Sequence, residues 1–310
     1  MNYYPITIPT LCRYEHFKRC IESLSRNTYA DKTELIIGLD YPSKEEHIKG
    51  YNQILEYIPT IKGFKTVTLF KRDKNFGPIP NILDLRKYAF EKYDACIFSE
   101  DDNEFSPCFL DFINQALDKY KNEDRILSVC GFSSTYYYGL STNIMFQKGT
   151  SAYGIGLWKH KENAYHSIPY TYWINMVKNP KRAWTIFLHC PGLYQMLNEM
   201  IKRNSQWGDV MRSCHQIENN IYQVIPYKSM VRNWGNDGSG LHCNNDGGIL
   251  SNQEILTCKK FEIIDKKIKN NIPWQKDFFA LLPKSVLSRV FIISKLFFHL
   301  IIKTLKSFFL

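Results

Sequence analysis

Residues 95–102 read ACIFSEDD, a short apolar run that stops at three consecutive acids. A run of this kind is typical of a buried strand, so the acids stand where that strand ends. Neighbouring carboxylates repel one another, and a divalent cation would offset the repulsion. Because Mg²⁺ and Mn²⁺ bind one or two carboxylates together with phosphate oxygens, Glu100, Asp101 and Asp102 predict a metal and diphosphate site. The alternative is a solvated acidic turn that caps a helix.

The residues before the acids alternate between strand and helix signals. Strands are expected at 5–9, 34–39, 66–70 and 95–99, and helices at 14–26, after Ser43 and at 80–93. This alternation predicts βαβ units and a mostly parallel sheet. Polar residues follow three of the strands, at 10–13, at Asp40 and at 100–102. Since ligands bind beyond the carboxyl ends of parallel strands, this convergence predicts a nucleotide-type site.

The signals downstream of the acids are weaker. We expect a helix at 109–120, a strand at 126–130, a turn at 151–158 and helical residues over 190–225. Residues 233–242 read NWGNDGSGLH, which is too rich in glycine for a regular element. Loops of this kind often carry functional residues on a rigid scaffold.

The composition predicts a folded protein. The chain has 310 residues, enough for one large domain or two small ones, and 44% of them are apolar. The nine cysteines include no CxxC pair, which argues against a zinc ribbon and a disulfide framework and predicts reduced thiols in a cytosol. The start, MNYYP, has no basic segment followed by an apolar one, so we expect no signal peptide.

The tail at 284–310 carries five cations and no acid, which is half of the net charge of +10. Its longest stretch without Lys or Arg, 296–302, is far below the roughly 20 residues that span a bilayer. On a helix its cations fall within an arc of about 140°, and Leu, Ile and Phe fill the rest. The pattern predicts a basic amphipathic helix lying in an anionic membrane interface, and no nucleic-acid partner. The alternative is a helix packed on the same protein or on a dimer partner.

Four sequence pieces occur in order between about residues 5 and 120. They are 8–13 with a helix through Arg19 and Cys20, 36–40, 75–78, and 98–102 followed by Ser106 and Pro107. The ordered set resembles GT-A glycosyltransferases, and its acids resemble the EDD variant of the DxD motif in the N-acetylglucosaminyltransferase I group. The whole chain is similar to bacterial family-two-like surface-polysaccharide transferases. The resemblance implies a GT-A fold and a nucleotide-sugar donor held with Mn²⁺ or Mg²⁺.

The resemblance also implies a role for each acid. Asp102 would be a metal ligand, whereas Glu100 and Asp101 would contact the donor sugar and the ribose. Asp40 would read the base by accepting a hydrogen bond from a ring N–H, which would suit uracil.

Four further residues would complete the donor site by the same resemblance. Thr10 and Arg13 would lie near the nucleotide and its phosphates, and Asn75 and Gly77 would shape the loop beside the base. The alternatives are a helix-surface cation for Arg13 and an ordinary turn for Asn75 and Gly77.

An inverting transfer needs a carboxylate that takes the proton from the acceptor hydroxyl. Residues 207–212 resemble the stretch that supplies this base, which makes Asp209 the candidate. The chain departs from the eukaryotic pattern at Gly208, where another acid is expected. The alternative is a helix-surface acid that pairs with Arg212 at i,i+3.

Two more residues are candidates for the donor site. His242 would complete the metal site or touch the diphosphate, because a late histidine does so in several GT-A enzymes; the alternative is a surface-loop histidine. Trp158 would be a platform for the donor sugar, and the alternative is a core residue.

The whole sequence therefore predicts one α/β domain at 1–262, with a donor half at 1–130 and an acceptor half at 131–262, and a membrane-associating tail at 263–310. The resemblance implies metal-dependent, inverting transfer of a sugar from a nucleotide donor to a glycan or lipid-linked acceptor, in bacterial capsule or lipopolysaccharide synthesis. With the basic tail, it places the predicted enzyme at the cytoplasmic face of the plasma membrane. Two alternatives stay open. A sugar nucleotidyltransferase would show a glycine-rich phosphate loop after the first strand, where residues 10–13 have no glycine. A non-catalytic membrane-associated binding protein would tolerate loss of Asp102.

Overall fold

The computed structural model describes residues 2–134, 143–239, 250–264, 267–271, 278, 281–283 and 285–307. The chain forms two compact units. The first comprises Met1–Met145, Ser151–Glu162 and Val224–Lys267, and the second comprises Phe146–Thr150, Asn163–Gln223 and Ile268–Leu310. The predicted division into a donor half and an acceptor half concerns function and stays a prediction.

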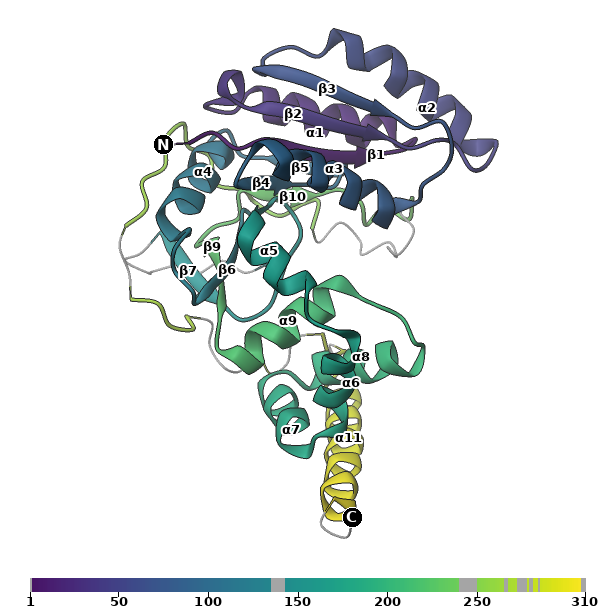
Figure 1. Cartoon of the computed structure of the whole chain (residues 1–310), viewed down its shortest axis with the longest axis vertical. Coiled ribbons are helices and arrows are strands. Elements are labelled where there is room, and N and C mark those ends of the chain that lie inside the picture. The colour runs from purple at the N-terminus through teal and green to yellow at the C-terminus, as the bar shows by residue number, and fades with distance from the viewer. Residues whose placement is uncertain are drawn as a thin grey trace. The chain divides into compact units, whose positions relative to one another are not determined.

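A central eight-stranded sheet has the order β3-β2-β1-β4-β8-β6-β9-β7 (Figure 1). Its strands are β1 Ile6–Thr10, β2 Glu34–Leu39, β3 Thr66–Lys71, β4 Ala95–Phe98, β6 Ile126–Cys130, β7 Ile144–Gln147, β8 Ile155–Trp158 and β9 Tyr222–Pro226. The pairs β1–β2, β2–β3 and β1–β4 are parallel, whereas β8 runs antiparallel to β4 and to β6. The predicted α/β class with a mostly parallel sheet is confirmed.

The register of the first strands brings their carboxyl ends to one level. Thr10 at the end of β1 pairs with Leu39 at the end of β2. Asp40 then donates its backbone N–H to the carbonyl of Thr10 at 2.9 Å, and Ser99, just after β4, donates to Thr7 at 3.1 Å. The residues that follow β1, β2 and β4 therefore lie along one edge of the sheet.

In the described part of the first unit the sheet is accompanied by the helices α1 Tyr14–Ser25, α2 Glu46–Tyr57, α3 Pro78–Lys92 and α4 Phe109–Tyr120, with short 3₁₀ turns η1 Ala30–Lys32 and η2 Ile58–Thr60. Helix α1 buries Phe17, Cys20, Ile21 and Leu24, the spacing that predicted it. Helix α3 begins two residues earlier than expected, at Pro78. A proline suits the first position of a helix because the N–H that it lacks would have no partner there.

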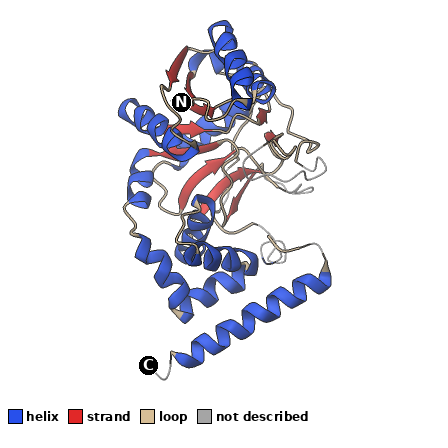
Figure 2. Ribbon diagram, turned by 90° about the vertical axis from the view of Figure 1, so that its right-hand side faces the viewer, coloured by secondary structure: helices blue, strands red, loops and turns tan. Residues whose placement is uncertain are grey.

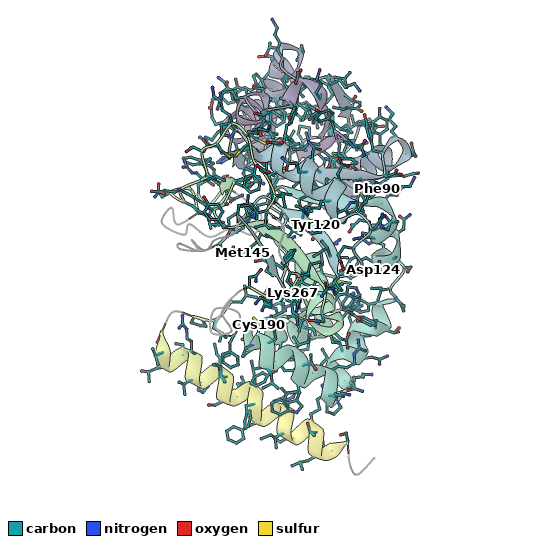
Figure 3. All side chains as sticks on the ribbon, turned by 90° about the vertical axis from the view of Figure 1, so that its left-hand side faces the viewer. Phe90, Tyr120, Asp124, Met145, Cys190 and Lys267 are labelled. Carbon is teal, nitrogen blue, oxygen red and sulfur yellow. A yellow bond between two sulfur atoms is a disulfide. The ribbon has the colours of Figure 1, made fainter. Side chains whose placement is uncertain are left out.

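The turn between α4 and β6 is held by one lysine, Lys161 in helix α5 Lys159–His166. Its Nζ donates to the carbonyls of Tyr120, Glu123 and Ile126 at 3.3, 2.9 and 2.6 Å. Figure 3 labels Tyr120, the last residue of α4, and Asp124 in this turn. The three bonds join the last residue of α4, the turn that follows it and the first residue of β6 through one side chain.

The second unit is helical. Its main helices are α6 Tyr170–Lys178, α7 Pro180–His189, α8 Pro191–Lys202, α9 Gly208–Asn219 and α11 Val286–Lys306. Its core includes Trp173, Tyr194 and Leu197, which are buried. The helix expected over 190–225 is confirmed for α8 and α9 but is wrong for residues 222–225. There Asn220 takes a left-handed conformation, with φ of 55°, and ends α9 before the strand β9.

The terminal helix α11 packs one face on its own unit (Figure 2). Leu300 is buried, Thr304 accepts a hydrogen bond from Trp184 Nε1 at 3.1 Å, and the ring of Phe297 lies 5.5 Å from that of Trp184. The Nζ of Lys303 donates to the carbonyl of Val177. One alternative from the sequence was a tail helix packed on the same protein. One face of α11 is packed in this way.

A second face of α11 is exposed and apolar. It carries Leu287, Val290, Phe291, Phe298, Ile302 and Leu305. On a helical projection Lys295, His299 and Lys306 lie along one edge of this face, and all three are exposed. Over the described part of the chain, no helix combines the length and hydropathy needed to cross a bilayer.

The expectation that all cysteines are reduced thiols is wrong for one pair. Cys108 and Cys258 form a disulfide, with their Cα atoms 5.5 Å apart. The bond ties the start of α4 to a segment that continues along this helix, where Phe261 N donates to Asp111 Oδ2 at 2.7 Å. The two cysteines are 150 residues apart in sequence, so no local pattern signals the pair. Among the described cysteines, six others are not part of a disulfide.

Candidate functional site

The acidic triplet lies directly after β4, where the chain turns into β5 Asn103–Phe105. Asp101 and Asp102 are only 5% and 6% exposed, whereas Glu100 is partly exposed. Asn103 Nδ2 donates to Ser99 Oγ at 2.9 Å and closes the turn. Two neighbouring carboxylates are thus withdrawn from water, which costs free energy unless they gain partners.

Arg13 supplies the positive charge for both acids. Its Nη1 lies 2.9 Å from Asp102 Oδ2, and its Nη2 donates to Asp101 Oδ1. Thr10 Oγ1 donates to the other oxygen of Asp101 at 2.7 Å. The structure therefore brings together four of the predicted donor-site residues, Thr10, Arg13, Asp101 and Asp102, at the ends of β1 and β4.

Burial and charge oppose each other in this cluster. Burial raises the pKa of Asp101, and Asp102 raises it further, although the charge of Arg13 pulls it down. Burial lowers the pKa of the Arg13 guanidinium, but the two carboxylates outweigh that effect and raise it. Arg13 therefore stays charged, and its charge favours the ionised form of Asp101.

A distant segment completes the shell around Asp102. Asn233, the last residue of β10 Val231–Asn233, donates from Nδ2 to Asp102 Oδ1 at 2.8 Å and to Asn103 Oδ1 at 3.0 Å. Trp234 N donates to the backbone carbonyl of Asp102 at 2.9 Å, and Gly235 N donates to Asn233 Oδ1 at 3.0 Å. Sequence reasoning singled out this glycine-rich stretch but did not identify these residues.

The segment after Gly235 lies along α1. The Arg19 guanidinium sits 4.2 Å from the ring centre of Trp234, and His16 Nε2 lies 2.9 Å from Asp237 Oδ2. Hydrogen bonds from Ser239 and His16 outweigh desolvation and lower the pKa of Asp237 to about 2. These contacts hold residues 234–239 beside the acids.

Asp40 organises a loop next to this cluster. Its carboxylate accepts the backbone N–H groups of Phe76 and Gly77 at 2.8 and 2.9 Å, and Asn75 Nδ2 lies 3.4 Å from it. Asn75 also donates to the carbonyl of Tyr41 at 2.7 Å. Gly77 has a φ of 78°, which favours glycine, just before α3. The predicted trio of Asp40, Asn75 and Gly77 is therefore assembled, while the reading of a base by Asp40 stays a prediction.

Trp158 does not lie at a surface where a sugar could stack. It is 2% exposed, and its Nε1 donates to the carbonyl of Leu117 at 3.0 Å. Strand β8 is inserted between β4 and β6, so Trp158 pairs with Ala95 in the interior of the sheet, and Lys161 Nζ lies 4.1 Å from the ring centre. The structure thus corrects the expectation of a sugar platform in favour of a core residue.

Asp209 belongs to the second unit, in the first turn of α9. Its side chain is exposed, although the surrounding chain desolvates the carboxyl and raises its pKa, against the charge of Arg212. Water screens much of this effect at an exposed group. Arg212 lies over the ring of Tyr165, 4.3 Å from its centre. His242 lies outside the described residues.

The side chains at this edge of the sheet decide which metal ion could bind there. In the part of the chain that is described, no group of three or more His, Cys, Asp or Glu side chains could hold a metal ion by itself. Asp101 and Asp102 offer two carboxylates, which suits Mg²⁺ or Mn²⁺ when phosphate oxygens supply further ligands. Two surface hollows of about 400 and 320 Å³ lie elsewhere in the first unit and include none of these acids in their lining.

No protein-family model and no curated protein matches the sequence. Among solved structures, the chain is similar to S. aureus TarS, with 12% identity over 48% of this chain and 25% of that one and a TM-score of 0.33. A part of TarS in complex with UDP-GlcNAc matches at 14% identity over 45% of this chain and 36% of that one, with a TM-score of 0.33. The mannosyltransferase PcManGT from Pyrobaculum calidifontis, in complex with GDP-Man and Mn²⁺, matches at 10% identity over 51% and 45%, with a TM-score of 0.36. The chain thus spans less than half the length of each of these proteins.

Proposed function

We propose that this chain is a GT-A-type glycosyltransferase that transfers a sugar, with inversion, from a nucleoside diphosphate donor to a hydroxyl group, and that it requires Mg²⁺ or Mn²⁺. One observation carries the proposal. Asp101 and Asp102 are buried together at the carboxyl edge of the sheet, in contact with Thr10 and Arg13. Carboxylates and a guanidinium at such an edge form a site suited to a metal and a diphosphate.

The donor would lie along this edge. The loop held by Asp40, with Asn75 and Gly77, would face the base, for which uracil is the preferred candidate. Thr10 and Arg13 would lie beside the diphosphate, and Glu100 and Asp101 beside the ribose and the sugar. Asp102 would hold the metal, with His242 as a further ligand, and a bound metal would offset the charge that develops on the leaving diphosphate.

Asp209 would act on the acceptor. Its carboxylate would take the proton from the acceptor hydroxyl while that oxygen attacks the anomeric carbon and the bond to the diphosphate breaks. A single displacement of this kind inverts the anomeric centre without a covalent intermediate.

We further propose that α11 brings the enzyme to the inner face of a bacterial plasma membrane. Its exposed apolar face and the basic edge formed by Lys295, His299 and Lys306 are features of helices that lie in an anionic interface. A lipid-linked or glycan acceptor for capsule or lipopolysaccharide synthesis would then be within reach.

The test is a panel of nucleotide sugars, each measured by thermal shift with and without Mn²⁺. At least one donor should raise the Tm, and more so with Mn²⁺. The variant Asp102→Asn should lose the Mn²⁺-dependent part, whereas Asp118→Asn on α4 should keep it. Transfer would release a nucleoside diphosphate, whereas a nucleotidyltransferase would release or consume pyrophosphate. If no donor shifts the Tm with or without Mn²⁺, the proposal fails.

A further inference from the structure

Arg13 lies where a metal would be expected. The two acids offer four carboxylate oxygens. Thr10 occupies one oxygen of Asp101, and Asn233 occupies one oxygen of Asp102. The two that remain, Asp101 Oδ1 and Asp102 Oδ2, are both bonded to the guanidinium of Arg13.

We propose that Arg13 is an exchangeable internal cation: it holds Asp101 Oδ1 and Asp102 Oδ2 in the donor-free protein, a divalent metal takes its place, and the released guanidinium binds the donor diphosphate. The inference rests on the proposed function and deepens it. It makes Arg13 the residue that couples metal binding to donor binding.

The space around Asp102 favours a metal ion that replaces Arg13 over one that binds in addition to it. A Cβ built on Gly235 would lie 2.1 Å from Asp102 Oδ2, so the backbone packs directly against that oxygen. Asn233 fixes the other oxygen from the same segment. A cation can therefore reach Oδ2 most directly from the side that Arg13 occupies.

Charge explains why the exchange needs a donor. Two carboxylates and one guanidinium carry a net charge of −1, and a divalent cation added alone would change this to +1 in a buried place. A donor diphosphate, with two negative charges, returns the cluster to −1 and offers Arg13 a new partner. Metal and nucleotide should therefore bind with positive coupling, and each should bind less tightly alone.

The experiment measures Mn²⁺ binding by the EPR signal of the free ion, with and without UDP, in the wild type and in Arg13→Gln. Without UDP, Arg13→Gln should bind Mn²⁺ at least about tenfold more tightly than the wild type. UDP should tighten Mn²⁺ binding by the wild type at least about tenfold, and by the variant much less.

The matched control is Arg86→Gln. Arg86 Nη1 forms an ion pair with the buried Glu162 at 2.9 Å in the same unit. This change should lower stability without affecting Mn²⁺ affinity. If Arg13→Gln fails to fold, Arg13→Lys takes its place: lysine keeps the charge but cannot bridge two carboxylates as a planar fork, so its Mn²⁺ affinity should exceed that of the wild type.

The experiment distinguishes failure of the Arg13 exchange from failure of the proposed function. If UDP binds but Mn²⁺ affinity is the same in the wild type and in the Arg13 variants, Arg13 is a permanent counter-ion, and the exchange is wrong while the proposed function stands. If neither UDP nor GDP binds to the wild type with or without Mn²⁺, the proposed function itself is wrong.

Discussion

The backbone of Gly235 packs against the carboxylate of Asp102 so closely that no side chain fits between them. An added Cβ would lie 2.1 Å from Asp102 Oδ2 and 2.8 Å from its Cγ. The carboxylate cannot easily turn away, because Asn233 and Arg13 hold its two oxygens. The glycine thus fixes the position of the predicted metal ligand.

We therefore predict that Gly235→Ala weakens donor binding. The methyl group would displace Asp102 or the segment after Asn233, at a cost of about 1–3 kcal/mol in the free energy of unfolding. Mn²⁺-dependent binding of a nucleotide, measured by calorimetry, should weaken at least about tenfold. Gly208→Ala is the control, because a Cβ there would meet nothing within 4 Å. Unchanged nucleotide affinity in Gly235→Ala would contradict the assignment of this site.

A second prediction concerns the disulfide between Cys108 and Cys258. Reduction, or the double change Cys108→Ser/Cys258→Ser, should lower the free energy of unfolding by about 2–4 kcal/mol, because the bond restricts the unfolded chain. Denaturant unfolding with and without a reducing agent measures this, and the double variant should show no response to the reductant. Titration of nine free thiols in the denatured, unreduced protein would contradict the pairing.

The sequence was sufficient to predict which residues meet at the carboxyl edge of the sheet. Apolar runs that end in polar residues located β1, β2 and β4, and parallel strands place their carboxyl ends together. The contacts from Thr10 and Arg13 to Asp101 follow from that topology. Such reasoning works here because each residue lies within a few positions of a strand end.

Contacts between distant segments could not be predicted in the same way. Asn233 lies 131 positions after Asp102, and Cys258 lies 150 after Cys108. Nothing local marks either pair, since the pairing depends on how the chain returns to the sheet. Trp158 was misjudged for a related reason: the antiparallel insertion of β8 between β4 and β6 decides that its ring is buried.

The exposed face of α11 gives a third prediction. Phe291 and Phe298 are 69% and 62% exposed, so Phe291→Ser/Phe298→Ser should leave folding intact and reduce co-sedimentation with anionic vesicles at least about fivefold. Ile48→Ser/Ile79→Ser, on exposed sites of α2 and α3, is the matched control. Binding should also weaken in zwitterionic vesicles and at high salt. Equal sedimentation of both double variants would argue against a membrane role for this face.

The fourth prediction separates chemistry from binding at Asp209. Asp209→Asn removes the proposed proton acceptor and should lower the turnover of sugar transfer by about 10²–10⁴-fold. Nucleotide affinity should stay within about twofold, because the change leaves the proposed donor-binding residues intact. Glu199→Gln, at a partly exposed position on α8, serves as the control. An unchanged rate in Asp209→Asn would assign the base to another residue.

The last prediction concerns pH and the helix that carries Asp209. Near the other end of α9, Glu218 accepts hydrogen bonds from Tyr172 and from Arg182, whose Nη2 lies 2.7 Å away. Burial raises the pKa of Glu218, but these bonds and the charge of Arg182 outweigh it and lower the pKa below its ordinary value of 4.5.

A carboxyl whose pKa falls on folding stabilises the protein above its unfolded pKa, and the stabilisation is lost as pH falls through the folded value. Glu218→Gln should therefore cost about 1–3 kcal/mol in the free energy of unfolding at pH 7. The difference from the wild type should shrink below pH 4.5, since protonation removes the same charge from the wild type. Glu199→Gln, which removes an exposed pair with Lys202, should change little at either pH. An equal cost of Glu218→Gln at pH 7 and at pH 3 would mean that packing, rather than the charge on Glu218, holds this end of α9.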